Sequence, residues 1–574
     1  MPDETALRNF DPLTFQILWS RAITIADEMS ATLVRTAFSS VVRDNHDYAV
    51  AIYDAGGRML AQSNQCTPGQ LGAMPLFVAD CLKQYPAETL EPGDVLITND
   101  PWVGSGHTPD IYLATPLFRD GKLAGFAANS AHHIDIGGRM ASPEAREVFE
   151  EGVIIPISKL YKRGEANDEL HRLIERNVRL PDKVIGDIRA QLAANHLGVR
   201  RLEALLDEGK VDSLAELAAA VVAHTEASMR EAIAAVPDGV YEHTIEMEDR
   251  DRDGNPLIIQ ARLDVEGDEI SVDYAGTSPQ VDMPINSVFN ITYAYTLFPI
   301  KCALHPHIPN NEGCARPIHV SAPEGTVLNP TFPAPVMWRT ALVYYLVEAV
   351  FGALAKAAPG RVKAQSGTIP LWVEKLGGRF DDGRPFILNF NAQGGQGATE
   401  ASDGVSTTVF PGNVASTSVE VMENETPILC EKKELRADSG GAGKHRGGVG
   451  QEIVLRNLAR KSAMASLSGG RFHIGATGMV GGGAGATGEI RIDGGEPEPI
   501  RREAMIEHDS VLHLHYPGGG GFGDPFERDP AAVLDDVRRG LVTPDRARTD
   551  YGVALTADGS AVDEDETAKL RGAA

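Results

Sequence analysis

The alternation of apolar and polar positions divides the chain into helix-like and strand-like segments. Residues 12–39 carry an apolar stripe at helical spacing, and Asp11 stands where an N-cap would, so one long helix is predicted there. Residues 111–118 and 122–129 are short apolar segments joined by Arg119-Asp120-Gly121, and Asp-Gly in that position is typical of a β-hairpin. Further helices are expected at 170–177, 183–206, 211–234, 288–304 and 340–357, and further strands at 48–53, 59–62, 94–98, 153–157, 240–247, 256–265 and 269–274.

These segments predict a mixed α/β (α+β), multidomain protein, since 574 residues exceed a single ordinary core. Glycine gathers in the last third without a Walker A motif or a dinucleotide fingerprint, and tight loops at strand ends are favoured over phosphate-binding loops. The expected parts are an N-terminal α/β region with the candidate site (1–165), a helical region (166–236), an α/β region (237–390), a Gly-rich β-containing region with terminal helices (391–555) and a mobile acidic tail (556–574).

Composition narrows the classes of partner. The net charge of −27 argues against nucleic acid, which is bound through basic patches. Five cysteines are odd in number and lack C-x-x-C spacing, so reduced thiols are expected, and a structural role is favoured over a nucleophilic one for Cys66 and Cys314. The N-terminal residues do not form a signal peptide, and no apolar run has the length of a membrane helix. We therefore expect a cytoplasmic protein with neither a nucleic-acid nor a membrane partner.

Histidine and aspartate side chains cluster at both chain ends of the predicted hairpin, away from its turn. His107 and Asp110 precede its first strand, while His132, His133 and Asp135 follow its second. A two-residue loop places Asp110 opposite residue 131, and a three-residue loop places it directly opposite His132. Either register brings both clusters to the same end of the hairpin.

Imidazole nitrogen and carboxylate oxygen are ligands that suit Zn, Mn or Fe. Two histidines with one carboxylate leave coordination positions open for water or substrate. The alternative interpretation is a set of hydrogen-bonding residues at a strand end, and the pattern does not select one metal.

Several motifs in this region and beyond it resemble those of one known family. They are Asn-Asp-Pro at 99–101, Gly-His-Thr-Pro-Asp at 106–110, Ala-His-His-Ile-Asp-Ile-Gly-Gly at 131–138, the Ser-Gly-Gly and Arg-Gly-Gly motifs within 434–448, and the glycine run at 516–525. The chain resembles the hydantoinase B/oxoprolinase family over about 11–553. That family includes the B-type components of ATP-dependent N-methylhydantoinases and lactamases, the C-terminal half of 5-oxoprolinase, and subunits of acetone and acetophenone carboxylases.

The resemblance implies roles for individual residues. The metal ligands would be His107, Asp110 and His132. Catalytic or orienting roles would fall to His133, Asp135 and Glu151, one of them as general base. The family commonly has a histidine where this chain has Gln70, so one possible active-site imidazole is missing.

The leading functional hypothesis is a metal-dependent subunit of an ATP-dependent cyclic amidohydrolase. It would hydrolyse a lactam, hydantoin or 5-oxoproline-type ring amide after a partner subunit has phosphorylated it. Because the chain has no ATP motif, ATP and Mg would come with a hydantoinase A-type subunit in a hetero-oligomer such as α2β2, and one Zn, Mn or Fe would belong to this chain. The alternatives are a subunit of an ATP-dependent ketone carboxylase and a non-catalytic scaffold for an ATPase partner.

Overall fold

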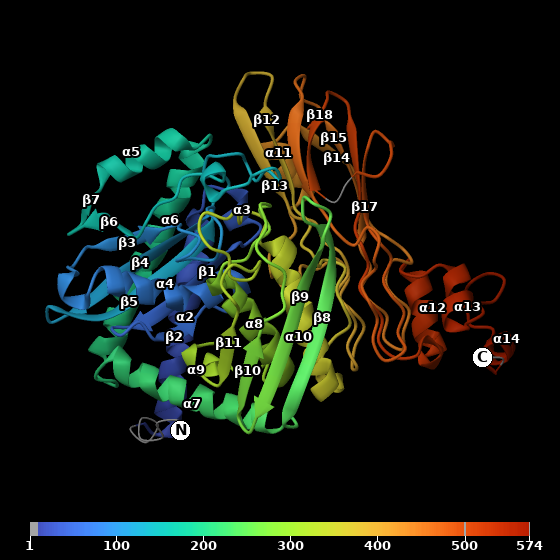
Figure 1. Ribbon diagram of the computed structural model, residues 1–574, viewed down its shortest axis with the longest axis horizontal. Coiled ribbons are helices and arrows are strands. Elements are labelled where there is room, and N and C mark those ends of the chain that lie inside the picture. The colour runs from blue at the N-terminus through green and yellow to red at the C-terminus, as the bar shows by residue number, and fades with distance from the viewer. Residues whose placement is uncertain (1–9, 499–500, 573–574) are drawn as a thin grey trace. The chain divides into compact units, whose positions relative to one another are not determined.

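A computed structural model describes residues 10–498 and 501–572, and the chain divides into two compact units (Figure 1). Unit 1 comprises Met1–Ile245 and Asp251–Ala357, and unit 2 comprises Glu246–Arg250 and Ala358–Ala574. This differs from the five expected parts, because the helices of 166–236 pack on the N-terminal sheet and share its core.

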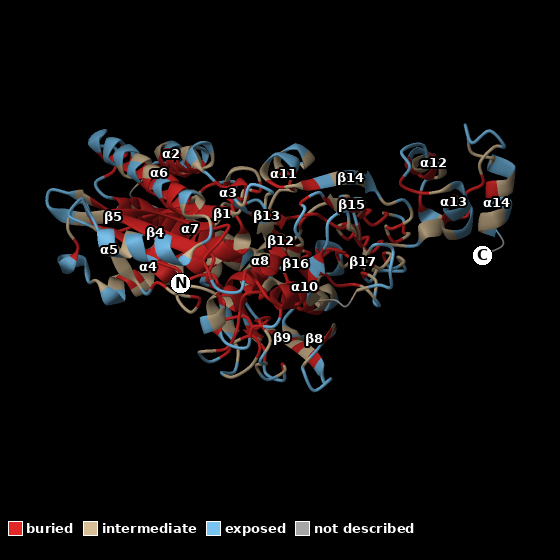
Figure 2. Ribbon diagram, turned by 90° about the horizontal axis from the view of Figure 1, so that it is seen from above, coloured by how far each residue is buried: buried red, intermediate tan, exposed pale blue. Residues whose placement is uncertain are grey.

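Unit 1 is built on a seven-stranded antiparallel sheet. The two longest strands, β4 and β5, form the predicted hairpin at its centre and are buried along most of their length (Figure 2). In spatial order the strands are β2 (Met59–Gln62), β1 (Tyr48–Asp54), β5 (Lys122–His132), β4 (Asp110–Arg119), β3 (Val95–Thr98), β6 (Ser158–Lys162) and β7 (Glu165–Ala166).

The hairpin has a two-residue turn and nevertheless places Asp110 directly opposite His132. Asp120 and Gly121 both have positive φ, 50° and 74°, as the sequence predicted for a tight turn. Arg119 pairs with Lys122 beside the turn, but the register shifts by one residue between Leu117 and Phe118. Because of this β-bulge, the two-residue turn of one alternative occurs together with the Asp110–His132 pairing of the other.

Helices cover both faces of this sheet. Asp11 caps the first by accepting hydrogen bonds from the backbone N–H of Leu13 and Thr14, and the helix ends at Thr36 rather than at the predicted residue 39. One face of the sheet is covered by α2 (Pro12–Thr36), α6 (Pro181–Asp207) and α7 (Leu214–Ala234), with α3 (Ser40–Arg43) and α5 (Asp168–Asn177) beside them, and the other face by α4 (Pro68–Gln84). On the side of α6 that faces the sheet, Asp187, Gln191 and Asn195 form a buried polar row.

The rest of unit 1 contains two long helices and a four-stranded sheet, of which only Glu246–Arg250 in the last strand are assigned to unit 2. Helix α10 (Thr340–Ala357) has the length and mean hydropathy of a membrane span, but 72% of it is buried among α8 and β9, which is typical of a core helix. The sheet has the order β11 (Ile318–Ser321), β10 (Glu269–Asp273), β9 (Pro256–Glu266) and β8 (Gly239–Arg250), and the other helices are α8 (Phe289–Leu304) and α9 (Glu312–Ala315).

Unit 2 is a sandwich of two antiparallel four-stranded sheets around one apolar core, in which Trp372 and Tyr516 are fully buried. One sheet has the order β13 (Pro385–Phe390), β12 (Glu374–Arg379), β16 (Ala463–Ser468), β18 (Arg501–Ile506), and the other β14 (Ile428–Leu435), β15 (Gln451–Asn457), β19 (Val511–His515), β17 (Glu489–Ile492). Shorter helices follow the chain as α11 (Val419–Glu425), α12 (Pro530–Arg538), α13 (Pro544–Tyr551) and α14 (Glu564–Gly572).

The glycine-rich segments of unit 2 differ from the expected tight loops. They run beside one another and are joined by backbone hydrogen bonds: the N–H of Gly519 donates to the carbonyl of Gly448, and the N–H of Gly521 to the carbonyl of Gly483. A Cβ added at Gly519 would lie 2.1 Å from the carbonyl oxygen of Gln396. Most of these glycines therefore allow backbones to approach closely, and few of them serve a positive φ.

The acidic tail was expected to be mobile and is instead folded as far as residue 572. Helix α14 packs through buried Thr567, whose hydroxyl accepts a hydrogen bond from the N–H of Ala554. Its charges are placed favourably along the helix, with acidic residues in the first turn and Lys569 and Arg571 in the last.

Candidate metal centre

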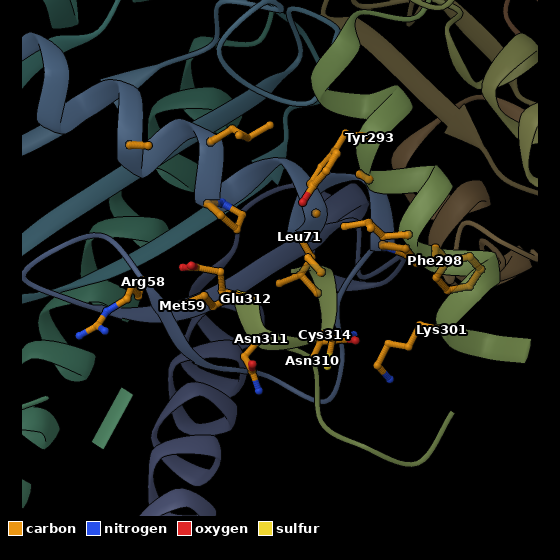
Figure 3. Close-up of a pocket in the computed structure, with 18 of the residues that line it drawn as sticks. Arg58, Met59, Leu71, Tyr293, Phe298, Lys301, Asn310, Asn311, Glu312 and Cys314 are labelled. Carbon is orange, nitrogen blue, oxygen red and sulfur yellow. The ribbon is translucent and has the colours of Figure 1, made fainter. Parts of the chain in front are cut away.

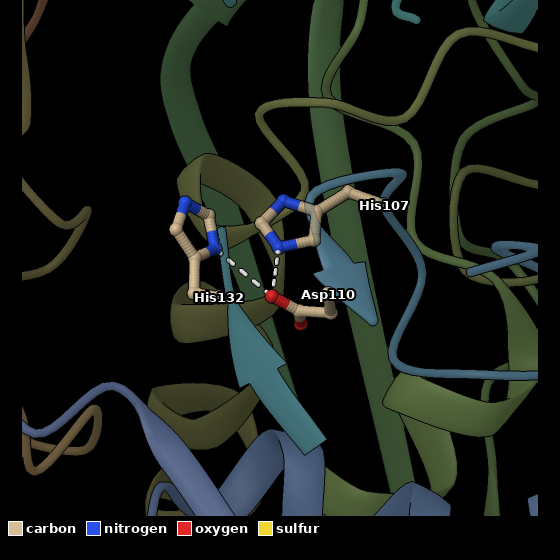
Figure 4. A group of neighbouring side chains, drawn as sticks. All are labelled: His107, Asp110 and His132. Atoms are coloured by element: carbon tan, nitrogen blue, oxygen red, sulfur yellow. Dashed lines mark hydrogen bonds and ion pairs between the residues drawn. The ribbon is translucent and has the colours of Figure 1, made fainter. Parts of the chain in front are cut away.

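The structure brings His107, Asp110 and His132 together at the end of the hairpin (Figure 4). Asp110 and His132 are the opposed pair that ends β4 and β5, and His107 lies three residues before Asp110 in the preceding loop. The Oδ1 atom of Asp110 is 2.8 Å from Nε2 of His107 and 2.9 Å from Nδ1 of His132. One potential ligand atom from each of the three residues therefore lies within 4.8 Å of the other two.

The surroundings of His107 leave a lone pair directed at Asp110. Its Nδ1 is 3.2 Å from the carbonyl oxygen of Met337, which can only accept, so Nδ1 carries the ring proton and Nε2 is unprotonated in the neutral ring. Burial, and to a smaller extent the positive charge of Arg339, lowers the pKa of His107 to about 3. An imidazole lone pair and a carboxylate oxygen thus face each other in a buried space, and a cation between them would satisfy both.

Asp110 is held from its other side by two further groups. Its Oδ2 accepts a hydrogen bond from Nη2 of Arg339 at 3.1 Å and one from the hydroxyl of Ser105. Burial opposes ionisation, but the hydrogen bond from His132 and the positive charge of Arg339 hold the pKa of this carboxyl well below its ordinary value. Asp110 is therefore an anion whose Oδ1 remains directed at the two imidazoles.

Asp47 lies beside the triad, just before β1. Its Oδ2 is 3.9 Å from Nδ1 of His132, and its Oδ1 accepts a hydrogen bond from the side-chain amide of Gln70 at 2.8 Å. The amide oxygen of Gln70 in turn accepts from the hydroxyl of Ser130 at 2.6 Å. Gln70 therefore acts here as a bridge between the sheet and Asp47.

His133 and Asp135 are not brought to the triad. His133 is directed at the other face of the sheet, where its Nε2 is 3.1 Å from the amide oxygen of Gln191 on α6. Asp135 accepts hydrogen bonds from the N–H of Gly137 and from Nη1 of Arg179, at 3.0 and 2.9 Å, and so fixes the chain before α6. These contacts favour positioning roles for both residues.

Glu151 is linked to the triad indirectly, through the backbone of Met337. Its Oε1 accepts hydrogen bonds from the N–H of Val336 and of Met337, both at 2.8 Å, and the carbonyl of Met337 is the group that faces His107. Burial raises the pKa of Glu151 to about 8. Among the predicted catalytic residues, Glu151 is the one linked to a triad member through a short chain of contacts.

A separate cavity of about 600 Å³ lies between α4 and α8 (Figure 3). Its walls are mainly apolar and include Leu71 and Phe298, together with Lys301, and no triad residue lines it. Cys314 also borders it, and burial raises the pKa of that thiol. Burial likewise raises the pKa of Cys66 to about 12, so both cysteines have the properties of structural thiols.

Comparison with known proteins decides the family. The family Hydantoinase B/oxoprolinase matches residues 11–525. The chain belongs to this family. The beta subunit of caprolactamase from Pseudomonas jessenii is 32% identical over 99% of this chain and 100% of its own length, and the B-type component of a putative D-/L-hydantoinase from Pseudomonas sp. (strain NS671) is 30% identical over 99% of each.

Solved structures agree with the assignment of fold. The crystal structure of ATP-dependent caprolactamase from Pseudomonas jessenii superposes with a TM-score of 0.89 at 31% identity, covering 98% of this chain and 100% of that one. A nucleotide-free acetone carboxylase also superposes with a TM-score of 0.89, at 23% identity over 99% of this chain and 83% of that chain. The second likeness shows a shared fold. The α+β architecture expected from the sequence is thus confirmed.

Two residues that contact the triad were absent from the site predicted from sequence. Arg339 immediately precedes α10 and is separated from Asp110 by 229 residues, so no local spacing connects them. Asp47 follows His46, whose φ of 56° belongs to a turn that the apolar pattern does not reveal. Both were recognisable only as polar residues flanking apolar segments, which describes many surface positions equally well.

Proposed function

We propose that this protein is the metal-dependent subunit of an ATP-dependent cyclic amidohydrolase acting on a lactam, hydantoin or 5-oxoproline-type ring. The observation that carries the proposal is the buried lone pair of His107 facing Asp110 and His132, the arrangement expected of a centre for one Zn, Mn or Fe. The relatives named as a caprolactamase and a hydantoinase support a cyclic amide as the substrate class.

Phosphorylation makes the ring amide reactive. Transfer of the γ-phosphoryl group of ATP to the amide oxygen yields an electrophilic ring carbon and ADP. One water adds to that carbon, the C–N bond breaks with the nitrogen taking a proton, and the resulting acyl phosphate is hydrolysed by a second water to carboxylate and phosphate. A divalent ion held by His107, Asp110 and His132 would supply Lewis-acid activation of the reacting oxygens.

The chain's own residues organise this centre. Asp110 presents one oxygen to both imidazoles while Arg339 and Ser105 hold the other. Glu151 fixes the backbone at Met337, whose carbonyl sets the tautomer of His107. His133 and Asp135 fix the opposite face of the hairpin and the start of α6, so among the three predicted catalytic residues Glu151 is the one we retain near the chemistry.

ATP chemistry belongs to a second subunit in this proposal. The sequence has no Walker A motif, and the names of the two relatives mark each of them as one component of a larger enzyme. We infer a hydantoinase A-type partner that binds ATP and Mg, in a hetero-oligomer such as α2β2. The five cysteines are free thiols, which fits a reducing cytoplasm.

A ketone carboxylase subunit is the second candidate, because the acetone carboxylase shares the fold. The decisive experiment uses this chain purified with its A-type partner. ATP-dependent ring opening of caprolactam, hydantoin or 5-oxoproline, with one transition metal per chain that His107→Ala and His132→Ala both lose, supports the hydrolase. Bicarbonate-dependent ATP consumption with acetone or acetophenone supports the carboxylase. Turnover unaffected by both alanine variants contradicts either catalytic role and leaves the scaffold.

A further inference from the structure

The cavity between α4 and α8 results from features of both helices. The helices touch where a Cβ added at Gly72 would lie 2.4 Å from the Cβ of Ala294. Each helix also carries an internal proline, Pro75 in α4 and Pro299 in α8, and such a proline removes a backbone hydrogen bond and bends the helix. The cavity begins beside this contact, and its volume of about 600 Å³ lies within the range of about 300–1,000 Å³ that is typical of small-molecule sites.

The rim of the cavity reaches solvent, and its interior is mainly apolar. Gly56 and Pro306 line it and are exposed, so a small molecule can reach the interior from the surface. Leu76, Leu297 and Phe298 form part of the wall and are half-buried, so some of their apolar surface faces the cavity. A molecule with an apolar body would cover that surface and gain free energy from its burial.

Three charged residues line the cavity, and two of them are paired with an opposite charge. Arg58 lies 2.6 Å from a carboxylate oxygen of Asp54, and Glu312 lies 3.1 Å from the guanidinium of Arg316. Lys301 is the third, and within residues 10–498 and 501–572 no carboxylate forms an ion pair with it. The cavity therefore presents one positive charge that the protein does not balance.

The surroundings of Lys301 favour an anion. Burial lowers the pKa of Lys301, and the groups that oppose this effect are the thiols of Cys314 and Cys302. Figure 3 shows Lys301 extending from α8 at the end of the cavity away from Arg58 and Glu312. Because a partly buried ammonium without a counter-charge is unfavourable, an anion beside it would be attracted more strongly than at the surface.

We propose that this cavity is a binding site for a small amphipathic carboxylate, whose charged group pairs with Lys301 and whose apolar body lies against Leu76, Leu297 and Phe298. One ammonium balances the single charge of a carboxylate, whereas a phosphate dianion would require further donors. The proposal does not rest on the proposed function, since no triad residue lines the cavity.

The test is a calorimetric titration of the full chain with octanoate, octanol and octylammonium. Octanoate should bind at one molecule per chain and at least about 10-fold more tightly than the other two, because it alone combines an apolar chain with a negative charge. Lys301→Met should lower the affinity for octanoate by about 10-fold or more and leave that for octanol unchanged, whereas Lys301→Arg keeps the charge and should stay within about threefold of the parent chain. The control is Lys83→Met, which removes a 77% exposed lysine of α4 and should match the parent chain.

Leu76→Trp tests where the apolar body lies. Its larger side chain should occupy part of the cavity and weaken the binding of octanoate and octanol together, and thermal midpoints show that each variant is folded. Absence of saturable octanoate binding would overturn the proposal. So would equal affinities for octanoate and octanol, tighter binding of octylammonium, or equal losses in Lys301→Met and Lys83→Met. Mn²⁺ binding should be unchanged in all of these variants, and its absence from the parent chain would contradict the proposed function but not this site.

Discussion

Arg339 donates from Nη2 to Oδ2 of Asp110 over 3.1 Å, and both side chains are almost completely buried. The guanidinium also donates through Nε to the carbonyl oxygen of Ser105. One residue from the start of α10 thereby fixes both the carboxylate and the loop that precedes β4. Asp110 can present Oδ1 to the two imidazoles because Arg339 holds Oδ2.

Replacing Arg339 with methionine should therefore weaken the metal centre without removing a ligand. Partners that orient ligating carboxylates contribute about 10- to 100-fold to metal affinity, so the dissociation constant for Mn²⁺ should rise within that range at unchanged stoichiometry. Calorimetric titration measures it. Arg316→Met, which removes a guanidinium that is 41% exposed, is the control. Equal affinities in Arg339→Met and the parent chain would disprove the orienting role.

Local patterns predicted the hairpin and its chemistry because both depend on residues close in sequence. Asp120-Gly121 specified the turn, and the alternation along the strands placed Asp110 and His132 at one end. The β-bulge that fixes their register was not predictable, since the spacing of apolar residues is compatible with both registers. Arg339 was missed for the same physical reason that long-range packing is generally missed: its contact with Asp110 depends on how whole elements fold together.

The glycine-rich part of unit 2 gives a second prediction. A Cβ at Gly518 would lie 1.6 Å from the carbonyl oxygen of Ser439, whereas one at Gly483 would meet nothing closer than 3.4 Å. Gly518→Ala should therefore lower the free energy of unfolding by at least about 3 kcal/mol, while Gly483→Ala in the same set of segments should change it by less than about 0.5 kcal/mol. Thermal and denaturant unfolding measure both. Similar stabilities for the two variants would contradict the close-packing explanation.

Glu374 should make the stability of unit 2 depend on pH. Burial raises its pKa to about 8, and Tyr516 donates to its Oε2 at 2.8 Å. Between pH 4.5 and about 8 the unfolded chain releases this proton while the folded chain keeps it, so the contribution to stability is complete at low pH and declines as pH rises. Relative to Glu374→Gln, the parent chain should lose roughly 1 kcal/mol per pH unit across this window.

Near-ultraviolet circular dichroism during urea unfolding reports on this region, because the rings of Trp372 and Tyr516 lie 4.7 Å apart in the core of the sandwich. Glu434→Gln, at a side chain that is 68% exposed, should keep the pH dependence of the parent chain. If Glu374→Gln and the parent chain lose stability in parallel from about pH 5 to 8, Glu374 does not retain its proton in the folded state.

If His133 and Asp135 are positioning residues, replacing them should lower stability and leave metal binding intact, whereas replacing a triad residue should abolish metal binding. Asp135 is 1% exposed at its side chain and pairs with Arg179, so Asp135→Ala leaves three backbone N–H groups and a guanidinium without their acceptor. Because the guanidinium is 42% exposed and water can solvate it, the loss of stability should be about 1–3 kcal/mol. His133→Gln keeps a polar side chain against Gln191 and should cost less.

Folded material of both variants should still bind one Mn²⁺ per chain within about threefold of the parent affinity. Neither residue contacts a triad residue through its side chain, and metal affinity depends on the ligands and their direct partners. Calorimetry after thermal-shift selection of folded protein separates the two effects. A variant that keeps its thermal midpoint but loses more than about 100-fold in kcat would return that residue to the catalytic set, since a loss of this size without unfolding is what removal of an acid–base group produces.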